Sequence, residues 1–165
     1  MMKAKKPISV EAATNRAAAL CARSEQAESD IRTKLGNWGL TPGEALHVIA
    51  RLKAENFLNE ERYAHAYCRD KFRFNGWGRI KIAFMLKGKG VGQPAIDAAL
   101  AEIDPTQYRE HLRALLQAKW RDVAAKEPAQ ARAALLRLAA SRGYEPEVIY
   151  RAVDELLSHV RASQD

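Results

Sequence analysis

The sequence contains few of the residues that build disulfide scaffolds or membrane spans. Only two cysteines occur among its 165 residues, Cys21 and Cys68, and neither belongs to a Cys-x-x-Cys pair. A disulfide-stabilised fold needs more cysteines, so we expect two buried or half-buried thiols in a reducing cytoplasm. No apolar run approaches the roughly 18 residues of a transmembrane helix, so we expect no membrane association.

Patterns typical of catalytic and metal sites are also missing. The four histidines, His47, His65, His111 and His159, lie in different segments, and none stands four residues from another. Such spacing does not predict a metal site. The run 88–92 lacks the Lys-Ser/Thr ending and the preceding strand of a phosphate loop, so we interpret it as a turn. We therefore expect no enzyme, no metal and no cofactor.

Strand patterns are absent as well, whereas a helical pattern occurs three times. Gly39, Gly90 and Gly143 are spaced by 51 and 53 residues, and a proline follows each within four residues. Glycine suits the left-handed end of one helix and proline the first turn of the next. Apolar residues with helical spacing follow each glycine, at Ala45, Val48, Ile49 and Leu52, at Ile96, Ala99, Leu100 and Ile103, and at Ile149, Ala152, Val153 and Leu156. Each repeat is thus predicted to contain a helix, a tight turn and a second helix.

A further amphipathic segment precedes each helix pair, at about 10–23, 60–74 and 105–126. Thr41 and Glu44 have the spacing of a capping box. The sequence therefore predicts an all-α fold of three tandem three-helix, helix-turn-helix-like repeats that form an elongated modular array. The predicted boundaries are 1–9 for a disordered basic tail, 10–58 for the first repeat, 59–104 for the second and 105–165 for the third.

The formal net charge of +7 arises in one stretch of the chain. Between Arg62 and Lys89 eight basic residues face a single acid, Asp70, while the rest of the chain is balanced. Clustered cations release counterions when they meet a polyanion, so we interpret this stretch as one surface for phosphates or for an acidic partner. The alternative is a solvated face without a partner. The candidate site residues are Arg62, Arg69, Lys71, Arg73, Arg79, Lys81, Lys87 and Lys89.

Aromatic side chains lie within the same stretch. On the helix predicted there, Tyr63, Tyr67 and Phe74 fall on one side, about 120° from the side of the arginines. We predict that these rings belong to the core, and stacking on nucleic-acid bases is the alternative. Residues 75–78 are predicted to form a turn whose tryptophan, Trp77, anchors the next helix.

These segments resemble the RecX family, regulators of the recombinase RecA. The resemblance covers about residues 15 to 160, and the matching segments are 19–24, 30–35, 52–64, 67–73, 77–82 and 86–91. It implies an elongated protein of three-helix repeats that binds in the groove of a RecA–DNA filament and modulates it, usually as an inhibitor. DNA contact is also implied. The chain departs from the family pattern at Arg23, where more arginines are common, and at Asn59, where an acid is usual.

The resulting hypothesis is a non-enzymatic regulator of homologous recombination and DNA repair. Its expected partners are the RecA filament, single-stranded DNA and, in second place, double-stranded DNA, and we expect a cytoplasmic monomer. The alternative is a general helical DNA-binding module with one helix in the major groove. A third class, a helical hydrolase with dispersed acids, would require a tightly bound metal.

Overall fold

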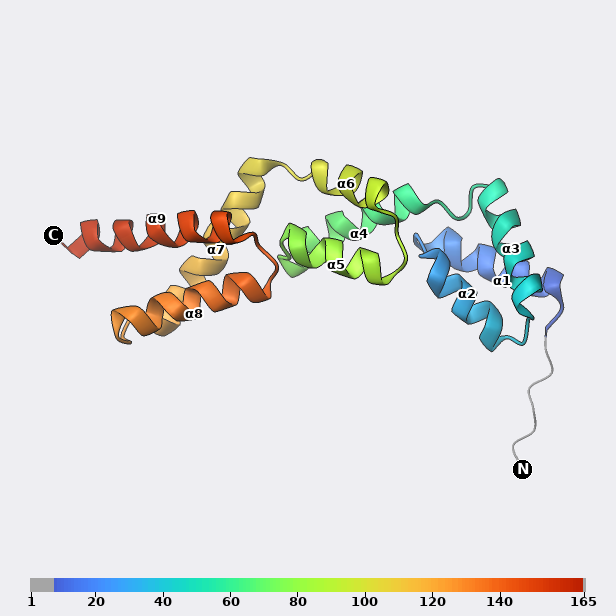
Figure 1. The fold of residues 1–165 in the computed structure, drawn as a ribbon, viewed down its shortest axis with the longest axis horizontal. Coiled ribbons are helices and arrows are strands. Elements are labelled where there is room, and N and C mark those ends of the chain that lie inside the picture. Colours follow the sequence, from blue (N-terminus) through green and yellow to red (C-terminus); the bar gives the residue numbers. More distant parts are fainter. Residues whose placement is uncertain (1–7, 165) are drawn as a thin grey trace, which may run out of the picture. The chain divides into compact units, whose positions relative to one another are not determined.

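A computed structural model of the protein describes residues 8–164, so nearly all of the predicted basic tail, residues 1–9, lies outside the described residues. Every regular element within that range is an α-helix (Figure 1). The helices are α1 (Val10–Arg23), α2 (Glu28–Asn37), α3 (Pro42–Ala54), α4 (Glu60–Asn75), α5 (Arg79–Gly88), α6 (Gln93–Ala101), α7 (Pro105–Val123), α8 (Pro128–Ser141) and α9 (Pro146–Gln164). They form three successive three-helix repeats, which confirms the predicted fold class.

The three repeats share the turn that the glycines predicted. Gly39, Gly90 and Gly143 have φ angles of 94°, 81° and 87°, in the left-handed region that glycine tolerates best. In each turn the residue after the glycine donates its N–H to a carbonyl five residues earlier, which closes the end of the helix. These bonds join Leu40 to Leu35 at 3.1 Å, Val91 to Leu86 at 3.1 Å and Tyr144 to Ala139 at 3.3 Å.

Side-chain caps fix the starts of two helices. The Thr41 hydroxyl accepts from the Glu44 N–H at 3.2 Å, and the Glu44 carboxylate accepts from the Thr41 N–H at 2.9 Å, which is the predicted capping box. The Asn59 side chain likewise accepts from the Arg62 N–H at 2.9 Å and starts α4.

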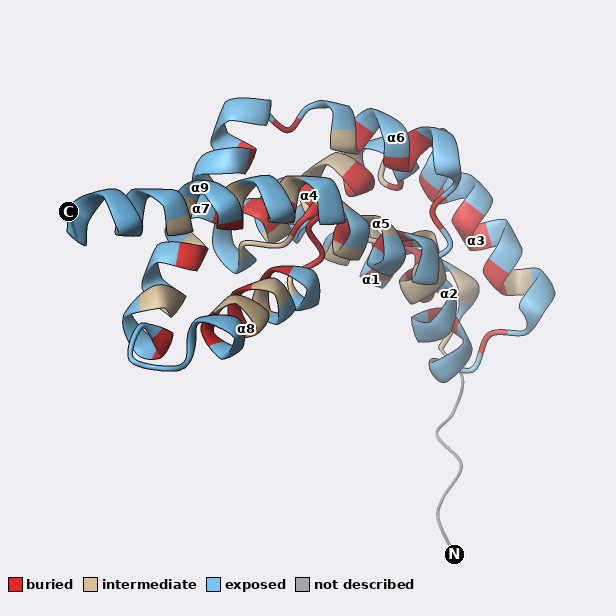
Figure 2. Cartoon of the chain, turned by 60° about the vertical axis from the view of Figure 1, so that its left-hand side comes forward, coloured by how far each residue is buried: buried red, intermediate tan, exposed pale blue. Residues whose placement is uncertain are grey.

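The chain divides into two compact units, and the division runs through the helices of the second repeat. The N-terminal unit comprises residues up to Ala66 together with Leu86–Ala98, and the C-terminal unit comprises Tyr67–Met85 together with the residues from Ala99 onward. In the first unit α1, α2 and α3 pack against one another, and in the second α7, α8 and α9 do the same. Each helix turns one side to its core and the other to solvent (Figure 2).

The N-terminal unit also includes the glycine turn of the second repeat. The Ser29 hydroxyl, at the start of α2, donates to the Lys89 carbonyl at 2.7 Å, and the Lys89 ammonium pairs with Asp30 at 3.0 Å. The Glu60 carboxylate accepts from the Gly92 N–H at 2.7 Å. The turn between α5 and α6 is therefore docked on the start of α2.

The C-terminal unit repeats this arrangement one repeat further along. The N–H groups of Gly78 and Ile80, at the start of α5, donate to the carbonyls of Arg142 and Gly143 at 2.7 and 2.9 Å. The first N–H groups of a helix have no partner inside it, and here the carbonyls of the next glycine turn serve as partners. In both units the turn of one repeat thus docks on the start of the second helix of the repeat before it.

The predicted core role of Phe74 is wrong. Phe74 is 83% exposed, whereas Phe72 is 5% exposed and Tyr63 is 8% exposed. The buried side of α4 is defined by Ala64, Cys68 and Phe72, which recur every four residues and are all buried. Phe74 lies about 160° around the helix from Phe72, so it faces away from that side.

Both cysteines are free thiols, as predicted, with Cys68 buried and Cys21 half-buried. Burial raises the pKa of both thiols, that of Cys68 to about 11. A thiol with a raised pKa is largely protonated at neutral pH and is a poor nucleophile, so neither cysteine has the properties of a catalytic residue.

Burial of Tyr144 gives the fold a defined sensitivity to alkali. Tyr144 is 2% exposed, its hydroxyl donates to the Gly76 carbonyl at 3.1 Å, and burial raises its pKa to about 12. Above pH 10 this side chain has lost its proton in the unfolded chain and keeps it in the folded chain, so Tyr144 alone should lower the free energy of unfolding by about 1.4 kcal/mol per pH unit up to pH 12, in addition to the losses from the other groups with raised pKa values. Urea unfolding at pH 9, 10 and 11 measures this decline. Tyr144→Phe should make it shallower, and an identical decline in the variant would contradict the assignment.

Candidate functional site

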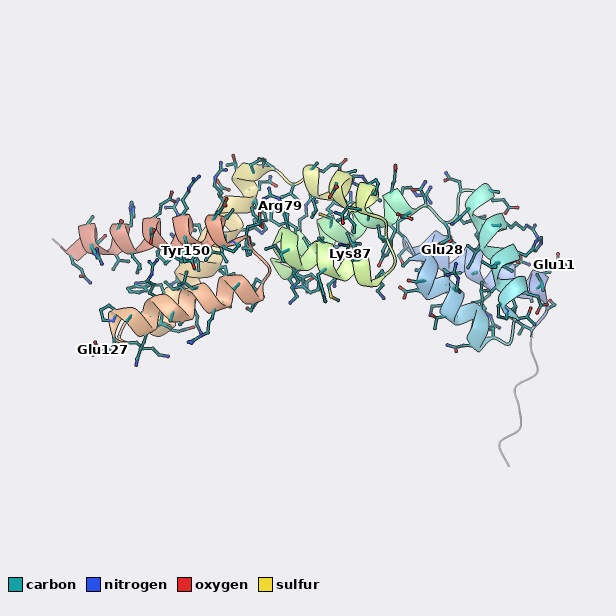
Figure 3. The ribbon with its side chains drawn as sticks, in the orientation of Figure 1. Glu11, Glu28, Arg79, Lys87, Glu127 and Tyr150 are labelled. Atoms are coloured by element: carbon teal, nitrogen blue, oxygen red, sulfur yellow. The ribbon has the colours of Figure 1, made fainter. Side chains whose placement is uncertain are left out.

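The eight predicted site residues are divided between the two units. Arg62, Lys87 and Lys89 belong to the N-terminal unit, and the other five belong to the C-terminal unit. Arg79 and Lys87, labelled in Figure 3, come from α5. Their surroundings differ sharply, because some are paired with acids inside the protein and others are not.

Arg62 is held by groups from its own unit. Its Nε donates to the Glu25 carboxylate at 2.9 Å, and its Nη2 donates to the Asn56 carbonyl at 2.8 Å. Asn56 itself has a φ of 63°, in the left-handed region. The guanidinium therefore ties the connection between α3 and α4 to the end of α1, and its charge is neutralised locally.

Arg79 belongs to a network of three side chains in the C-terminal unit. Its guanidinium pairs with the Glu145 carboxylate at 2.9 Å and lies 4.0 Å from the centre of the Tyr108 ring. The Tyr108 hydroxyl donates to Glu145 and accepts from the Arg79 N–H at 3.0 Å. Burial, reinforced by the hydrogen bond to Glu145, raises the pKa of Tyr108. This network joins α5 to α7 and to the residue before α9.

Arg62, Arg79 and Lys89 thus make ion pairs within the protein. A partner that contacted these groups would have to compete with Glu25, Glu145 and Asp30. We therefore leave these three residues out of the contact surface that we propose, and we assign them a role in holding the fold.

Lys71 and Lys81 gather around one aromatic ring. Their ammonium groups lie 4.9 and 4.5 Å from the centre of the Trp77 ring, and Tyr67 meets the same ring edge-on at 6.4 Å. Neither lysine has a carboxylate partner within residues 8–164. The ring attracts each cation but does not neutralise it, so the ammonium groups keep donors for a ligand. Trp77 thus brings two positive charges together.

Arg69 and Arg73 form a second pair on a different side of α4. Both are exposed, and four residues of helix separate their directions by about 40°. Lys71 points about 160° away from each of them. Neither arginine forms an ion pair in the part of the chain that the structure describes. Arg69 and Arg73 therefore lie on a different side of α4 from Lys71. We call these three residues, together with Lys81 and Lys87 of α5, the open cations.

A groove in the described part of the chain carries charges of both signs. It encloses about 1130 Å³ in the C-terminal unit and is lined by residues of α7 and α9 together with Arg79. Arginines and carboxylates are equally numerous along it, so it has no field of one sign to attract a polyanion. No candidate residue from the sequence other than Arg79 lines it.

Metal-binding clusters and membrane-spanning helices are absent from the described residues. No group of three or more His, Cys, Asp or Glu side chains in residues 8–164 is arranged to hold a metal ion. Of the helices described, none combines the length and the apolar character needed to cross a bilayer. The open cations remain the clearest candidate site.

Sequence reasoning missed the exposed side of α5. Ile80 and Phe84 are 50% and 74% exposed, and neither was predicted from the sequence as part of a surface. A signal was present, however. The segment Arg79–Gly88 has apolar residues in almost every direction, and a short helix cannot bury all of them against one core.

The structure thus defines an all-helical repeat protein whose second repeat displays, within residues 8–164, cations without acid partners beside half-buried aromatic rings. Two family models match the chain. One, described as the second three-helix domain of RecX, matches residues 59–100, and the other, described as the third three-helix domain of RecX, matches residues 107–153. Together they cover more than half of the sequence, and the chain belongs to the RecX family.

Relatives from distant bacteria support this assignment. A protein named Regulatory protein RecX from Mycolicibacterium smegmatis is 26% identical over 137 residues, which covers 81% of this chain and 73% of that protein. A protein of the same name from Clostridium perfringens (strain 13 / Type A) is 30% identical over 125 residues, 74% of this chain and 58% of that protein. The chain thus spans less than two thirds of the clostridial relative.

Solved structures share the fold. The crystal structure of RecX from Lactobacillus salivarius aligns with a TM-score of 0.80 and 16% identity, covering 89% of this chain and 96% of that one. A second structure, of regulatory protein RecX, aligns with the same TM-score and 21% identity, covering 88% and 71%. At these identities the likeness concerns the arrangement of helices.

Proposed function

We propose that this chain is a non-enzymatic regulator of homologous recombination and DNA repair that binds the RecA–DNA filament and inhibits the recombinase. The family supports a regulatory role, and the observation that carries the proposal is the set of cations that the second repeat leaves without acid partners. We propose a cytoplasmic monomer whose three repeats span residues 10–58, 59–104 and 105–165.

The proposed contacts to the filament are the open cations. Lys71 and Lys81 come first, because Trp77 holds both ammonium groups near one ring. Arg69 and Arg73 form the second pair, and Lys87 of α5 is also exposed. Each cation that meets a phosphate of single-stranded DNA releases a counterion, which favours association and makes it sensitive to salt.

The direct test is the DNA-dependent ATPase rate of RecA, measured with and without this chain. Sub-stoichiometric amounts should lower the rate, because one bound regulator blocks growth of the filament beyond it. An unchanged rate at every ratio up to equimolar would exclude an inhibitory regulator. A raised rate would mean that regulation has the opposite sign.

Removal of the two lysines should change the salt dependence of binding. Lys71→Ala/Lys81→Ala is expected to weaken binding to the filament and to make the slope of log K against log salt shallower by about 1.4, since each single-strand phosphate contact contributes about 0.7. Fluorescence anisotropy at several salt concentrations measures the slope. The matched control is Lys34→Ala/Arg137→Ala, which removes two exposed charges from α2 and α8. Equal slopes in the two variants would contradict the assignment.

A general DNA-binding module is the alternative, and the rings of Tyr67 and Trp77 beside Lys71 are the observation in its favour. Competition between bare DNA and RecA-coated DNA separates the two functions. Preference for the coated form is expected for the regulator, and preference for bare DNA would favour the module.

A further inference from the structure

Exposed apolar side chains are concentrated in the same segment as the open cations. Six large hydrophobic residues are exposed in the described part of the chain, and four of them lie between positions 74 and 85. These four are Phe74 at 83%, Ile80 at 50%, Phe84 at 74% and Met85 at 36%. All four belong to the C-terminal unit. Exposed apolar residues that form a contiguous patch often mark a site of interaction.

Three of these residues share one side of α5. Taking Ile80 as the origin, Phe84 lies about 40° around the helix and Met85 about 140°, while the buried residues Ile82 and Leu86 lie at about 200° and 240°. The helix therefore has two apolar sides. One of them forms part of the core, and the other has no partner in the described chain.

Positive charge lies within the exposed side. Lys81 lies between Phe84 and Met85, at about 100° from Ile80, and Trp77 holds Lys71 near it. No acidic residue occurs between Asp70 and Asp97. A surface that complements this one must therefore combine apolar groups with negative charge beside them.

A protein surface meets these requirements better than DNA does. Bases can stack on Phe84, but Ile80 and Met85 are not aromatic and offer no ring for stacking. Protein interfaces, by contrast, commonly have an apolar centre that includes aromatic residues and methionine, with charged groups at the rim. The exposed side of α5 has this composition.

We propose that the exposed side of α5, formed by Ile80, Phe84 and Met85 with Lys81 among them, docks an acidic amphipathic segment of a protein. Given the proposed function, that segment belongs to the recombinase protomers of the filament, so this inference rests on that function. The open cations then serve DNA and the acidic rim, while the apolar residues provide most of the affinity for protein.

The test compares two double variants, each of which removes one exposed aliphatic and one exposed aromatic side chain. Ile80→Ala/Phe84→Ala removes the proposed centre, and Leu46→Ala/Tyr150→Ala removes residues that are 57% and 51% exposed on other helices. Dissociation constants are measured for RecA filaments on single-stranded DNA and for the same DNA without RecA. We expect the first variant to bind filaments about 30-fold more weakly, as for removal of an interface hot spot, with an unchanged salt slope and unchanged affinity for bare DNA. The control pair should change neither constant.

A charge series at one position tests the sign of the partner. Phe84→Lys should bind filaments better than Phe84→Glu, because the proposed rim of the partner is acidic. Phe84 is largely exposed, so neither change should unfold the chain, and thermal unfolding verifies this.

Three results would overturn the inference. Equal loss of affinity for bare DNA and for filaments would mean that the apolar side stacks on bases. Wild-type affinity in Ile80→Ala/Phe84→Ala would mean that this side has no partner on the filament, while the proposed function would stand. Absence of filament binding by the wild-type chain would remove the proposed function and this inference with it.

Discussion

Replacement of Gly143 by alanine should lower the free energy of unfolding by about 3 kcal/mol or more, through strain and overpacking together. Gly143 is buried, has a φ of 87°, and sits in the turn that docks on α5. A Cβ atom added there would overlap the Cβ of Lys81 and lie 2.5 Å from the Lys81 nitrogen, and neither of these atoms belongs to the flexible end of a side chain. The chain would have to move the turn away from α5.

Two other glycines provide graded controls. Gly90 has a φ of 81° but nothing within 4 Å of an added Cβ, so Gly90→Ala should cost only the left-handed conformation, about 1 to 2 kcal/mol. Gly36 lies in α2 with open space around it, so Gly36→Ala should stabilise the chain by about 0.5 to 1 kcal/mol. Urea unfolding followed by circular dichroism measures all three. Equal losses for Gly143→Ala and Gly90→Ala would contradict the docked turn.

Replacement of Arg79 by alanine should destabilise the fold by about 2 kcal/mol, because it leaves the Glu145 carboxylate partly buried without its cation. The side chains of Arg79 and Glu145 are 29% and 30% exposed, so solvent screens the loss in part. The sequence alone predicted Arg79 only as a contact residue. Its contacts with Glu145 and Tyr108 add a role in stability.

A double-mutant cycle tests this role. Arg79→Ala combined with Glu145→Ala should cost less than the two separate changes added together, since the second removes a group that the first leaves unpaired. Arg69→Ala is the control, because Arg69 is exposed and forms no ion pair in the described chain, and it should alter stability by less than about 0.5 kcal/mol. Strict additivity of Arg79→Ala and Glu145→Ala would exclude the coupling.

The repeat architecture was predictable because its signals are local. Glycine, proline and apolar positions in each repeat are separated by a few residues, and they act through the backbone angles of one turn. Gly39, Gly90 and Gly143 accordingly take the conformation that their spacing implies. The capping box at Thr41 is equally local, since both of its partners lie within three residues.

Which cations form ion pairs within the protein was not predictable, because their acidic partners lie far away in the sequence. Arg62 meets an acid 37 residues away, Lys89 one 59 residues away and Arg79 one 66 residues away. No pattern within a single helix distinguishes these three from Arg69 or Lys71. Only the packing of one repeat on the next decides which charges are neutralised.

The error over Phe74 has a similar origin. Tyr63, Tyr67 and Phe74 do share a direction on α4, but the helix has aromatic rings on more than one side. Phe72 is buried because it stacks on His111 and Tyr108 of α7, at 4.3 and 6.0 Å between ring centres. Packing against α7 therefore decides which aromatic ring of α4 is buried, and α7 begins 30 residues after the end of α4.

The contact between the Gly143 turn and Lys81 links the proposed binding residues of α5 to the turn between α8 and α9. Any ligand that restrains Lys81 also restrains the backbone on which the last glycine turn rests, and a change at that turn displaces the charged residue directly. Binding of a partner to α5 should therefore slow amide hydrogen exchange in α8 and α9. These two helices carry none of the proposed contacts. Binding at the second repeat would in this way stabilise the third repeat as well.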